Sequence, residues 1–247
     1  MRRFKIIREP LELSGLRVVS STYRVDLINQ IFNAIERGDL EPGKLLEVAQ
    51  YDLSSSSAPS TSKSAVKSIA KSINQKPHLI IRETSRTLLF TILVYYAIQD
   101  LLENNNLYLY PEPNLIEIGK TFDYAVVDET RKNIVFLAEV KRLRAINNLI
   151  SYIEEFDEKL NELKRRTILD HIDATIFHLH LTPIFIRESR EVEQLLRSFG
   201  KLINNQNISM LLTITSGESF NKLTEDLKQQ LSMRLQHRKK QEPPFNI

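Results

Sequence analysis

Hydrophobic positions in the first hundred residues follow the spacing of amphipathic helices. Ile28, Phe32 and Ile35 are three or four positions apart, and Gly38 follows as a stop signal. The segment SSSSAPSTSKS, which covers 54–64, has the most biased composition of the chain and is interpreted as a flexible loop or linker. The helices expected in this part of the chain are 23–37, 64–73 and 83–103.

Beyond residue 103, short strand-like segments alternate with helical ones. Leu149, Phe156 and Leu163 lie on the apolar face of the most amphipathic of these helices. The polar residues 128–133 separate two of the strands and are the right length for a hairpin turn. The expected strands are 107–110, 115–118, 122–127, 134–141, 174–182 and 209–215, and the expected helices are 149–166, 188–203 and 220–236.

This order of elements predicts the α/β fold class, with a central mixed β-sheet flanked by helices. A chain of 247 residues is long enough to bury one sizeable core. We predict an N-terminal helical region over 1–75 that carries the serine-rich loop 54–64, a core domain over 76–240, and a tail over 241–247.

The charge balance makes local clustering more informative than the total. With 34 basic and 31 acidic side chains the formal net charge is only +3, so attraction to a polyanion must come from basic clusters. Such clusters are either solvated surface or contacts to phosphate groups, and the sequence leaves both open. They comprise Arg2, Arg3, Lys5 and Arg8, the helical series Lys63, Lys67 and Lys71, and Arg234, His237, Arg238, Lys239 and Lys240.

Several classes of chemistry are excluded or disfavoured. The chain has no cysteine, which excludes disulfides, thiolate zinc sites and cysteine nucleophiles, so a metal must bind to oxygen or imidazole. Its six glycines form no phosphate-binding loop, and His178 and His180 are interpreted as residues on one face of a strand. No signal-peptide pattern is found and the most apolar run, 88–98, is too short to span a bilayer, so we expect a cytoplasmic protein without membrane association.

The chemically informative segment is IEIGKTFDYAVVDETRKNIVFLAEVKR, residues 116–142, in which one strand carries Asp123 and the next carries Glu139 and Lys141. Side chains alternate across a strand, so Glu139 and Lys141 project from the same face. If the two strands form a hairpin, Asp123 comes close to Glu139, and two neighbouring carboxylates call for a cation between them. Magnesium suits such a site, with the backbone carbonyl of Val140 as a third protein ligand.

These residues also indicate a reaction. A bound metal ion would lower the pKa of a water molecule and neutralise charge on a scissile phosphate. Lys141 would orient or deprotonate the attacking water and stabilise the transition state. The pattern therefore predicts metal-dependent hydrolysis of a phosphodiester bond, and the alternative is a structural ion pair without catalytic function.

An Asp on one strand of a hairpin and Glu-x-Lys on the next resembles the PD-(D/E)XK nuclease superfamily, the restriction-endonuclease-like proteins. The order of the superfamily core is helix, three-stranded meander, helix, strand, which residues 83–182 follow. The resemblance implies that Asp123 and Glu139 bind magnesium, that Lys141 is the catalytic lysine and that the substrate is nucleic acid. Phe122 replaces the proline of the motif.

Other residues enter through the same resemblance. No glutamine follows in the next helix, as it does in some exonuclease branches, so Asn147, Asn148 and Tyr152 would have to serve instead. Some members add an acid from the leading helix, where Glu83 is the candidate, although a glutamate in a first helical turn also complements the helix dipole. Candidates for phosphate contacts are Arg82, Arg86, Arg142 and Arg144.

We therefore expect a magnesium-dependent endonuclease, with Mn²⁺ as a possible substitute, that cleaves double-stranded DNA in the manner of a sequence-specific restriction enzyme. Homodimer formation is an expectation from the resemblance alone. A junction resolvase, a viral or repair nuclease and an RNA-cleaving enzyme remain open. So do a catalytically silent nucleic-acid-binding module and a scaffold protein that uses the charged helix 149–166 for partner contacts.

Overall fold

The computed structural model of the chain describes most of its first 181 residues and shorter stretches after them. The described residues are 6, 9–13, 16–20, 22–49, 60–85, 88–130, 132–143, 146–166, 168, 172–181, 210–216, 224–225, 227–229, 231–233 and 235–236. Within them, no helix is long and apolar enough to cross a membrane.

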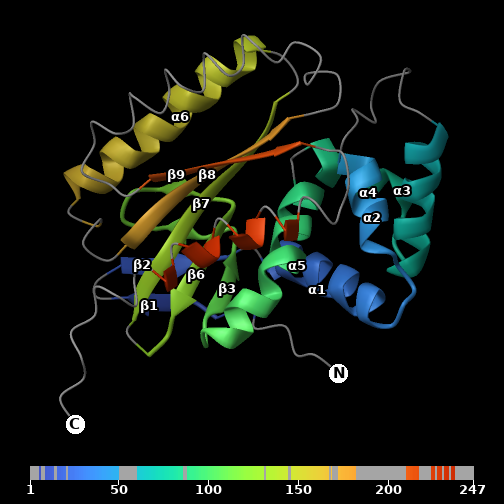
Figure 1. The fold of residues 1–247 in the computed structure, drawn as a ribbon, viewed down its shortest axis with the longest axis horizontal. Coiled ribbons are helices and arrows are strands. Elements are labelled where there is room, and N and C mark those ends of the chain that lie inside the picture. Colours follow the sequence, from blue (N-terminus) through green and yellow to red (C-terminus); the bar gives the residue numbers. More distant parts are fainter. Residues whose placement is uncertain are drawn as a thin grey trace.

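The elements form an α/β fold in which helices cover both faces of a mixed sheet, as expected (Figure 1). The helices are α1 (Thr22–Glu36), α2 (Pro42–Ala49), α3 (Ser60–Ser72), α4 (Pro77–Ser85), α5 (Leu88–Asn104) and α6 (Ile146–Arg165). The strands are β1 (Leu11–Leu13), β2 (Leu16–Val19), β3 (Tyr108–Pro111), β4 (Asn114–Leu115), β5 (Lys120–Thr121), β6 (Tyr124–Asp128), β7 (Asn133–Leu143), β8 (Ile172–Leu181) and β9 (Met210–Ser216).

The larger sheet contains β3, β6, β7, β8 and β9 in that spatial order among the described strands. The first three form an antiparallel meander, whereas β8 is parallel to β7 and β9 is parallel to β8. The crossover from β7 to β8 contains α6, as a parallel connection requires. A smaller antiparallel sheet joins β1, β2, β4 and β5.

Each face of the larger sheet has its own hydrophobic core. One core joins the sheet to α1–α5 and to the helical residues between 224 and 236, and includes Val126, Ala138 and Val140. The other joins it to α6 and the smaller sheet, and includes Leu137, Phe156 and Phe177. Figure 1 shows α6 on one side of the sheet and α1–α5 on the other. The region 1–75 therefore shares a core with later elements, and its predicted boundary stays a prediction.

A β-bulge sets which residues of β7 face α6. Val126 pairs with Phe136 and Val127 with Ile134, so Val135 is an extra residue opposite the β6 ladder. Because side chains alternate along a strand, this extra residue exchanges the two faces of β7 beyond it. Leu137 and the alternate positions after it consequently face α6.

Most predicted helices and strands agree with the structure, but the serine-rich segment differs. Helix α3 already begins at Ser60, so 60–64 is helical rather than a linker, while 54–59 lies outside the described residues. Ser62 is fully buried and its hydroxyl donates to the carbonyl of Glu47 at 3.1 Å. Packing against α2 thus extends the helix beyond what serine propensity indicates.

The predicted helix 83–103 is two helices, with α4 ahead of α5. Pro77 occupies the first helical position of α4, which is favourable because proline has no N–H to satisfy. Glu83 lies near the end of this shorter helix, so the expectation that it begins the long helix, or complements its dipole, is wrong.

The predicted strand 115–118 is also shorter than expected. Only Asn114–Leu115 is a strand, it belongs to the smaller sheet, and 116–119 is a turn. Gly119 has a φ of 62°, a left-handed conformation that glycine adopts without strain and that lets β5 return along β4.

At the C-terminal side, β9 agrees with the predicted strand 209–215, and the described residues between 224 and 236 are helical, as predicted. The predicted helix 188–203 lies outside the described residues. Sequence patterns missed β1, β2, β5, α2 and α4, all short elements whose apolar periodicity is too brief to register.

We predict that Phe156 anchors α6 to the sheet. Its buried ring packs on Phe177 with 5.1 Å between centroids, so Phe156→Ala should lower the free energy of unfolding by about 3 kcal/mol or more. Urea unfolding followed by circular dichroism measures the change. Ile150→Ala is the matched control because Ile150 lies on the same helix but is exposed. Equal effects of the two substitutions would contradict this packing.

Candidate active site

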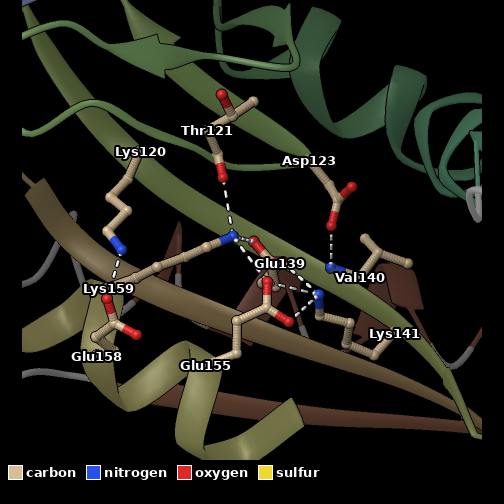
Figure 2. Close-up of polar contacts among 9 residues, drawn as sticks. All are labelled: Lys120, Thr121, Asp123, Glu139, Val140, Lys141, Glu155, Glu158 and Lys159. Carbon is tan, nitrogen blue, oxygen red and sulfur yellow. Dashed lines mark hydrogen bonds and ion pairs between the residues drawn. The ribbon is translucent and has the colours of Figure 1, made fainter. Parts of the chain in front are cut away.

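The predicted Glu139 and Lys141 lie on β7, the central strand of the larger sheet, and face α6 (Figure 2). They are two positions apart and therefore share a face, as expected. Glu139 pairs in register with Phe177, and Lys141 with Leu179, both of which belong to the core beneath α6. The site thus sits where an apolar sheet face meets a helix.

Asp123 immediately precedes β6, whereas the sequence pattern predicts it within the strand. Its backbone is held on three sides: the N–H donates to the carbonyl of Ala138 at 3.0 Å, and the carbonyl accepts from the N–H of Glu112 at 3.0 Å and from the Tyr95 hydroxyl at 2.6 Å. The Asp123 carboxylate accepts from the N–H of Val140 at 2.6 Å. These contacts fix the carboxylate against β7.

Glu112, whose N–H donates to the Asp123 carbonyl, has an unusual backbone conformation. It is buried, and its φ of 44° is a left-handed conformation that costs a non-glycine residue free energy. Strained residues of this kind persist where the surrounding contacts impose them, and they concentrate at functional sites. Here the strain accompanies the hydrogen bond that positions Asp123.

Two lysines hold the buried carboxylate of Glu139, which is 4% exposed. Lys141 Nζ lies 2.9 Å from Glu139 Oε1, and Lys159 Nζ lies 2.8 Å from Glu139 Oε2. Lys159, on α6, also donates to the carbonyl of Thr121 at 2.9 Å and lies 5.2 Å from the centre of the Phe122 ring. Both oxygens of Glu139 therefore have a cationic partner.

A second carboxylate on α6 completes the cluster. Glu155 lies 2.9 Å from Lys141 and 3.5 Å from Lys159, and about half of its side chain is exposed. Lys141 also lies 5.4 Å from the centre of the Tyr152 ring. At the rim, Lys120 and Glu158 form an exposed pair at 2.6 Å. Figure 2 shows the cluster between α6 and β7.

The carboxyl of Asp123 has an unusually high pKa for an aspartate. Burial and, after it, repulsion by Glu139 raise its pKa from 3.8 to about 7, against the opposing effect of the Val140 N–H. Near neutral pH it therefore exchanges between a neutral acid and a second, partly buried anion. A cation beside Asp123 and Glu139 would offset the repulsion by Glu139, the second cause of this raised pKa after burial.

Lys141 is held in its charged form. Burial alone would lower its pKa, but the interactions with Glu139 and Glu155 outweigh burial and raise the pKa above its ordinary value. The ammonium therefore persists at physiological pH and cannot take a proton from water. Of the two roles predicted for Lys141, this favours orientation and charge stabilisation over deprotonation.

The groups present, two carboxylates and a backbone carbonyl, are of the chemical kind that a hard divalent cation prefers. The N–H of Val140 points to Asp123, and since the N–H and C=O of one extended residue face the same neighbouring strand, its carbonyl faces that side too. Asp123, Glu139 and this carbonyl suit magnesium, which retains several waters. To bind the ion, Glu139 would have to use an oxygen that already pairs with a lysine. Within the described residues, no three or more Asp, Glu or His side chains are arranged so that they could hold one metal ion together.

The other predicted site residues are distributed differently. Arg82 is exposed on α4, and Asn148 and Tyr152 are partly buried on α6. Of these three, Tyr152 lies beside Lys141 and so borders the cluster. Arg86 and Arg144 lie outside the described residues, and the side chains of Glu83, Arg142 and Asn147 lie outside them as well.

His178 is a buried core residue on the opposite face of the sheet. Its Nε2 lies 2.6 Å from the hydroxyl of Tyr124, and burial lowers its pKa to about 3, so it remains neutral. This agrees with its interpretation as a sheet-face residue. The side chain of His180 lies outside the described residues.

Sequence reasoning missed Lys159 and Glu155. Lys159 lies three positions after Phe156 and four before Leu163, so helical spacing places it within the apolar stripe of α6. A lysine in a buried stripe needs an anionic partner, and Glu155 precedes it by one helical turn. That combination was a readable signal for a charged site beneath the helix.

We predict that removing Lys159 destabilises the protein far more than removing a lysine at the rim. Lys159→Ala leaves a buried carboxylate with one partner and should cost about 3 kcal/mol in the free energy of unfolding. Lys120→Ala is the control because its partner Glu158 is exposed, and its unfolding midpoint should stay close to wild type. Denaturant titration compares them, and comparable midpoints would refute the buried network.

Asp123→Asn should become progressively more favourable as pH rises. The raised pKa means that the folded state binds the Asp123 proton more tightly than the unfolded state. This stabilisation is complete below 3.8 and disappears as pH rises through about 7. The asparagine amide does not ionise, so its stability relative to wild type should improve by roughly 3 kcal/mol between about pH 5 and pH 8.5, at about 1.4 kcal/mol per pKa unit.

Thermal unfolding at the two pH values measures this change. Glu158→Gln is the control because the pKa of Glu158 is lowered by its hydrogen bond to Lys120, so its carboxylate is ionised throughout the range. A constant difference between Asp123→Asn and wild type across this range would mean that Asp123 is not the titrating group.

Comparison with known proteins identifies no relative of this chain. No protein-family model, no curated protein and no solved structure matches the chain. The functional interpretation therefore depends on the chemistry of the cluster formed by Asp123, Glu139, Lys141, Glu155 and Lys159.

Proposed function

We propose that this protein is a magnesium-dependent phosphodiester hydrolase acting on nucleic acid. The observation that carries the proposal is the pair formed by the partly buried carboxyl of Asp123 and the buried carboxylate of Glu139, beside the charged Lys141. Burial and, after it, repulsion by Glu139 raise the pKa of Asp123. A carboxylate pair that lacks full neutralisation, next to an ammonium, suits a metal ion and a phosphate.

The order and pairing of elements support the same class. Helix α5, the meander β3–β6–β7, helix α6 and the parallel strand β8 follow the order of the PD-(D/E)XK core, to which residues 83–182 bear resemblance. In this chain the β4–β5 hairpin is inserted within the meander. Phe122 at the proline position and the missing glutamine are its departures from the motif.

In this proposal each residue has a distinct task. Asp123, Glu139 and the Val140 carbonyl would hold the ion, which when bound supplies an acidified water and neutralises phosphate charge. Lys141 would orient the attacking water and stabilise negative charge on the phosphate oxygens. Lys159 would orient Glu139, and Glu155 would hold Lys141 on the α6 side.

Within this class, a sequence-specific restriction-type endonuclease that cleaves double-stranded DNA as a homodimer is our first choice. Mn²⁺ would replace Mg²⁺ because both are hard cations suited to oxygen ligands. Junction resolvases, viral or repair nucleases and RNA-cleaving enzymes share the same chemistry and differ in substrate.

One observation favours a second candidate, a catalytically silent nucleic-acid-binding module. Both oxygens of Glu139 already have lysine partners, so this carboxylate is neutralised without a metal ion. In that case the pKa of Asp123 would stay raised, and added magnesium would not change the stability of the protein.

The decisive experiment incubates the purified protein with supercoiled plasmid and magnesium. The wild type should nick or cut the plasmid, EDTA should abolish the reaction, and Asp123→Asn and Lys141→Gln should each lower the rate by about 10²-fold or more. Lys228→Gln should cleave like wild type because Lys228 pairs with Asp100 away from the cluster. Discrete fragments would support sequence specificity.

A magnesium titration of thermal stability runs beside the cleavage assay. Magnesium or manganese should stabilise the wild type but not Asp123→Asn, which is expected to fold well and so separates a lost ligand from a lost fold. Inertness on duplex, branched and single-stranded DNA and on RNA, without a metal response, would reject the hydrolase and favour the binding module.

A further inference from the structure

Helix α3 carries a row of exposed lysines that the proposed site does not use. Lys63, Lys67 and Lys71 recur every four residues and all three are exposed. Residues at this spacing lie on one side of a helix, so the three ammonium groups form a ridge, which we call the α3 ridge. It extends over about 12 Å at 1.5 Å per residue.

The ridge has no internal counter-charge. Helix α3 contains no aspartate or glutamate, and none of the three lysines forms an ion pair or hydrogen bond with a residue that the structure describes. Carboxylates nearby are already engaged: Glu47, whose carbonyl accepts from Ser62, pairs with Lys44, and Asp39, whose carbonyl accepts from Ser72, pairs with Arg37. A row of cations without counter-charge raises the local positive potential in a way that a mixed surface does not.

The other side of α3 is fixed in the protein core. Ala65, Val66, Ile69 and Ala70 are buried in the core that includes α1, α2 and α5. The lysines are therefore presented from a rigid support instead of a tail. This burial also argues against a lipid surface, because a membrane-binding amphipathic helix needs its apolar face free to enter the bilayer.

The chemistry of the ridge matches a nucleic-acid backbone. One strand of B-DNA carries a phosphate about every 3.4 Å of its axis, so the length of the ridge corresponds to three or four phosphates. Exposed hydroxyls of Ser64 and Ser68 lie among the lysines and are common donors to phosphate oxygens. Figure 1 shows α3 at the outer edge of the helical layer, away from α6.

We propose that the α3 ridge is a sequence-independent binding surface for the phosphate backbone of nucleic acid, separate from the Asp123–Glu139 site. The choice of nucleic acid among polyanions rests on the proposed function, whereas the binding itself requires neither metal nor catalysis. The ridge contributes affinity and register along the backbone, and base identity is not read there.

The test measures binding of the full chain to a fluorescent random-sequence duplex in EDTA, across a salt series. Replacing Lys63, Lys67 and Lys71 together by glutamine should weaken binding and reduce the log–log salt slope by about 2.7, at 0.9 for each phosphate that the variant no longer neutralises. A second variant with three arginines at these positions should keep the wild-type slope. Thermal unfolding confirms that both variants fold, as glutamine and arginine favour helix.

A charge-matched control separates the ridge from net charge. Arg37, Arg165 and Arg166 are exposed and each is paired with an acid, so replacing all three by glutamine removes the same formal charge. This control should show a much smaller decrease in affinity and in slope. Equal decreases in both triple variants, an unchanged slope in the ridge variant, or stronger capture by anionic vesicles than by duplex would overturn the proposal.

The two proposals fail independently. Wild-type binding that depends on the ridge, without cleavage under magnesium, retains the ridge and rejects the hydrolase. Magnesium-dependent cleavage with an unchanged salt slope in the ridge variant retains the hydrolase and rejects the ridge.

Discussion

The buried carboxylate of Glu139 is the constraint around which the centre of the molecule is arranged. An anion taken out of water is tolerated only with close partners, and Glu139 receives one from its own strand and one from α6. The apolar stripe of α6 that packs on the sheet also carries Lys159 to this carboxylate. Packing and charge thus determine the same helix position, and neither would be satisfied if the helix shifted along the sheet.

Hydrogen bonds to the backbone of Asp123 fix the position of the second carboxylate. Its N–H and C=O are both bonded, to Ala138, Glu112 and Tyr95, before its side chain accepts the N–H of Val140. The strained φ of Glu112 belongs to this arrangement. With Asp123, Glu139 and Glu155 ionised, the cluster has three carboxylates against the two ammonium groups of Lys141 and Lys159, so its formal charge is negative unless Asp123 holds its proton.

Periodicity predicted the long elements and the shared strand face of Glu139 and Lys141, because burial and face alternation are local properties of the sequence. It did not predict that Asp123 precedes β6, that α4 and α5 are separate helices, or that α3 begins at Ser60, because contacts between distant segments decide these features. Ser62 is helical because α2 accepts its hydroxyl. Lys159 could have been identified, because its position in the apolar stripe of α6 is visible in the sequence. Its partner Glu139 on β7 could not, because the sequence does not show which strand α6 packs against.

What distinguishes this cluster from an ordinary buried salt bridge is Asp123. Glu139 with Lys141 and Lys159 would be a complete ion-pair network without a second buried or partly buried carboxyl beside it. Instead the chain holds a second carboxyl there, with one N–H as the partner of its side chain and a pKa raised to about 7 by burial and by Glu139. In a network serving stability alone, that carboxyl would contribute only its hydrogen bond from the Val140 N–H. A cation site would gain more from it, because a bound ion would turn the repulsion between the two carboxylates into shared coordination.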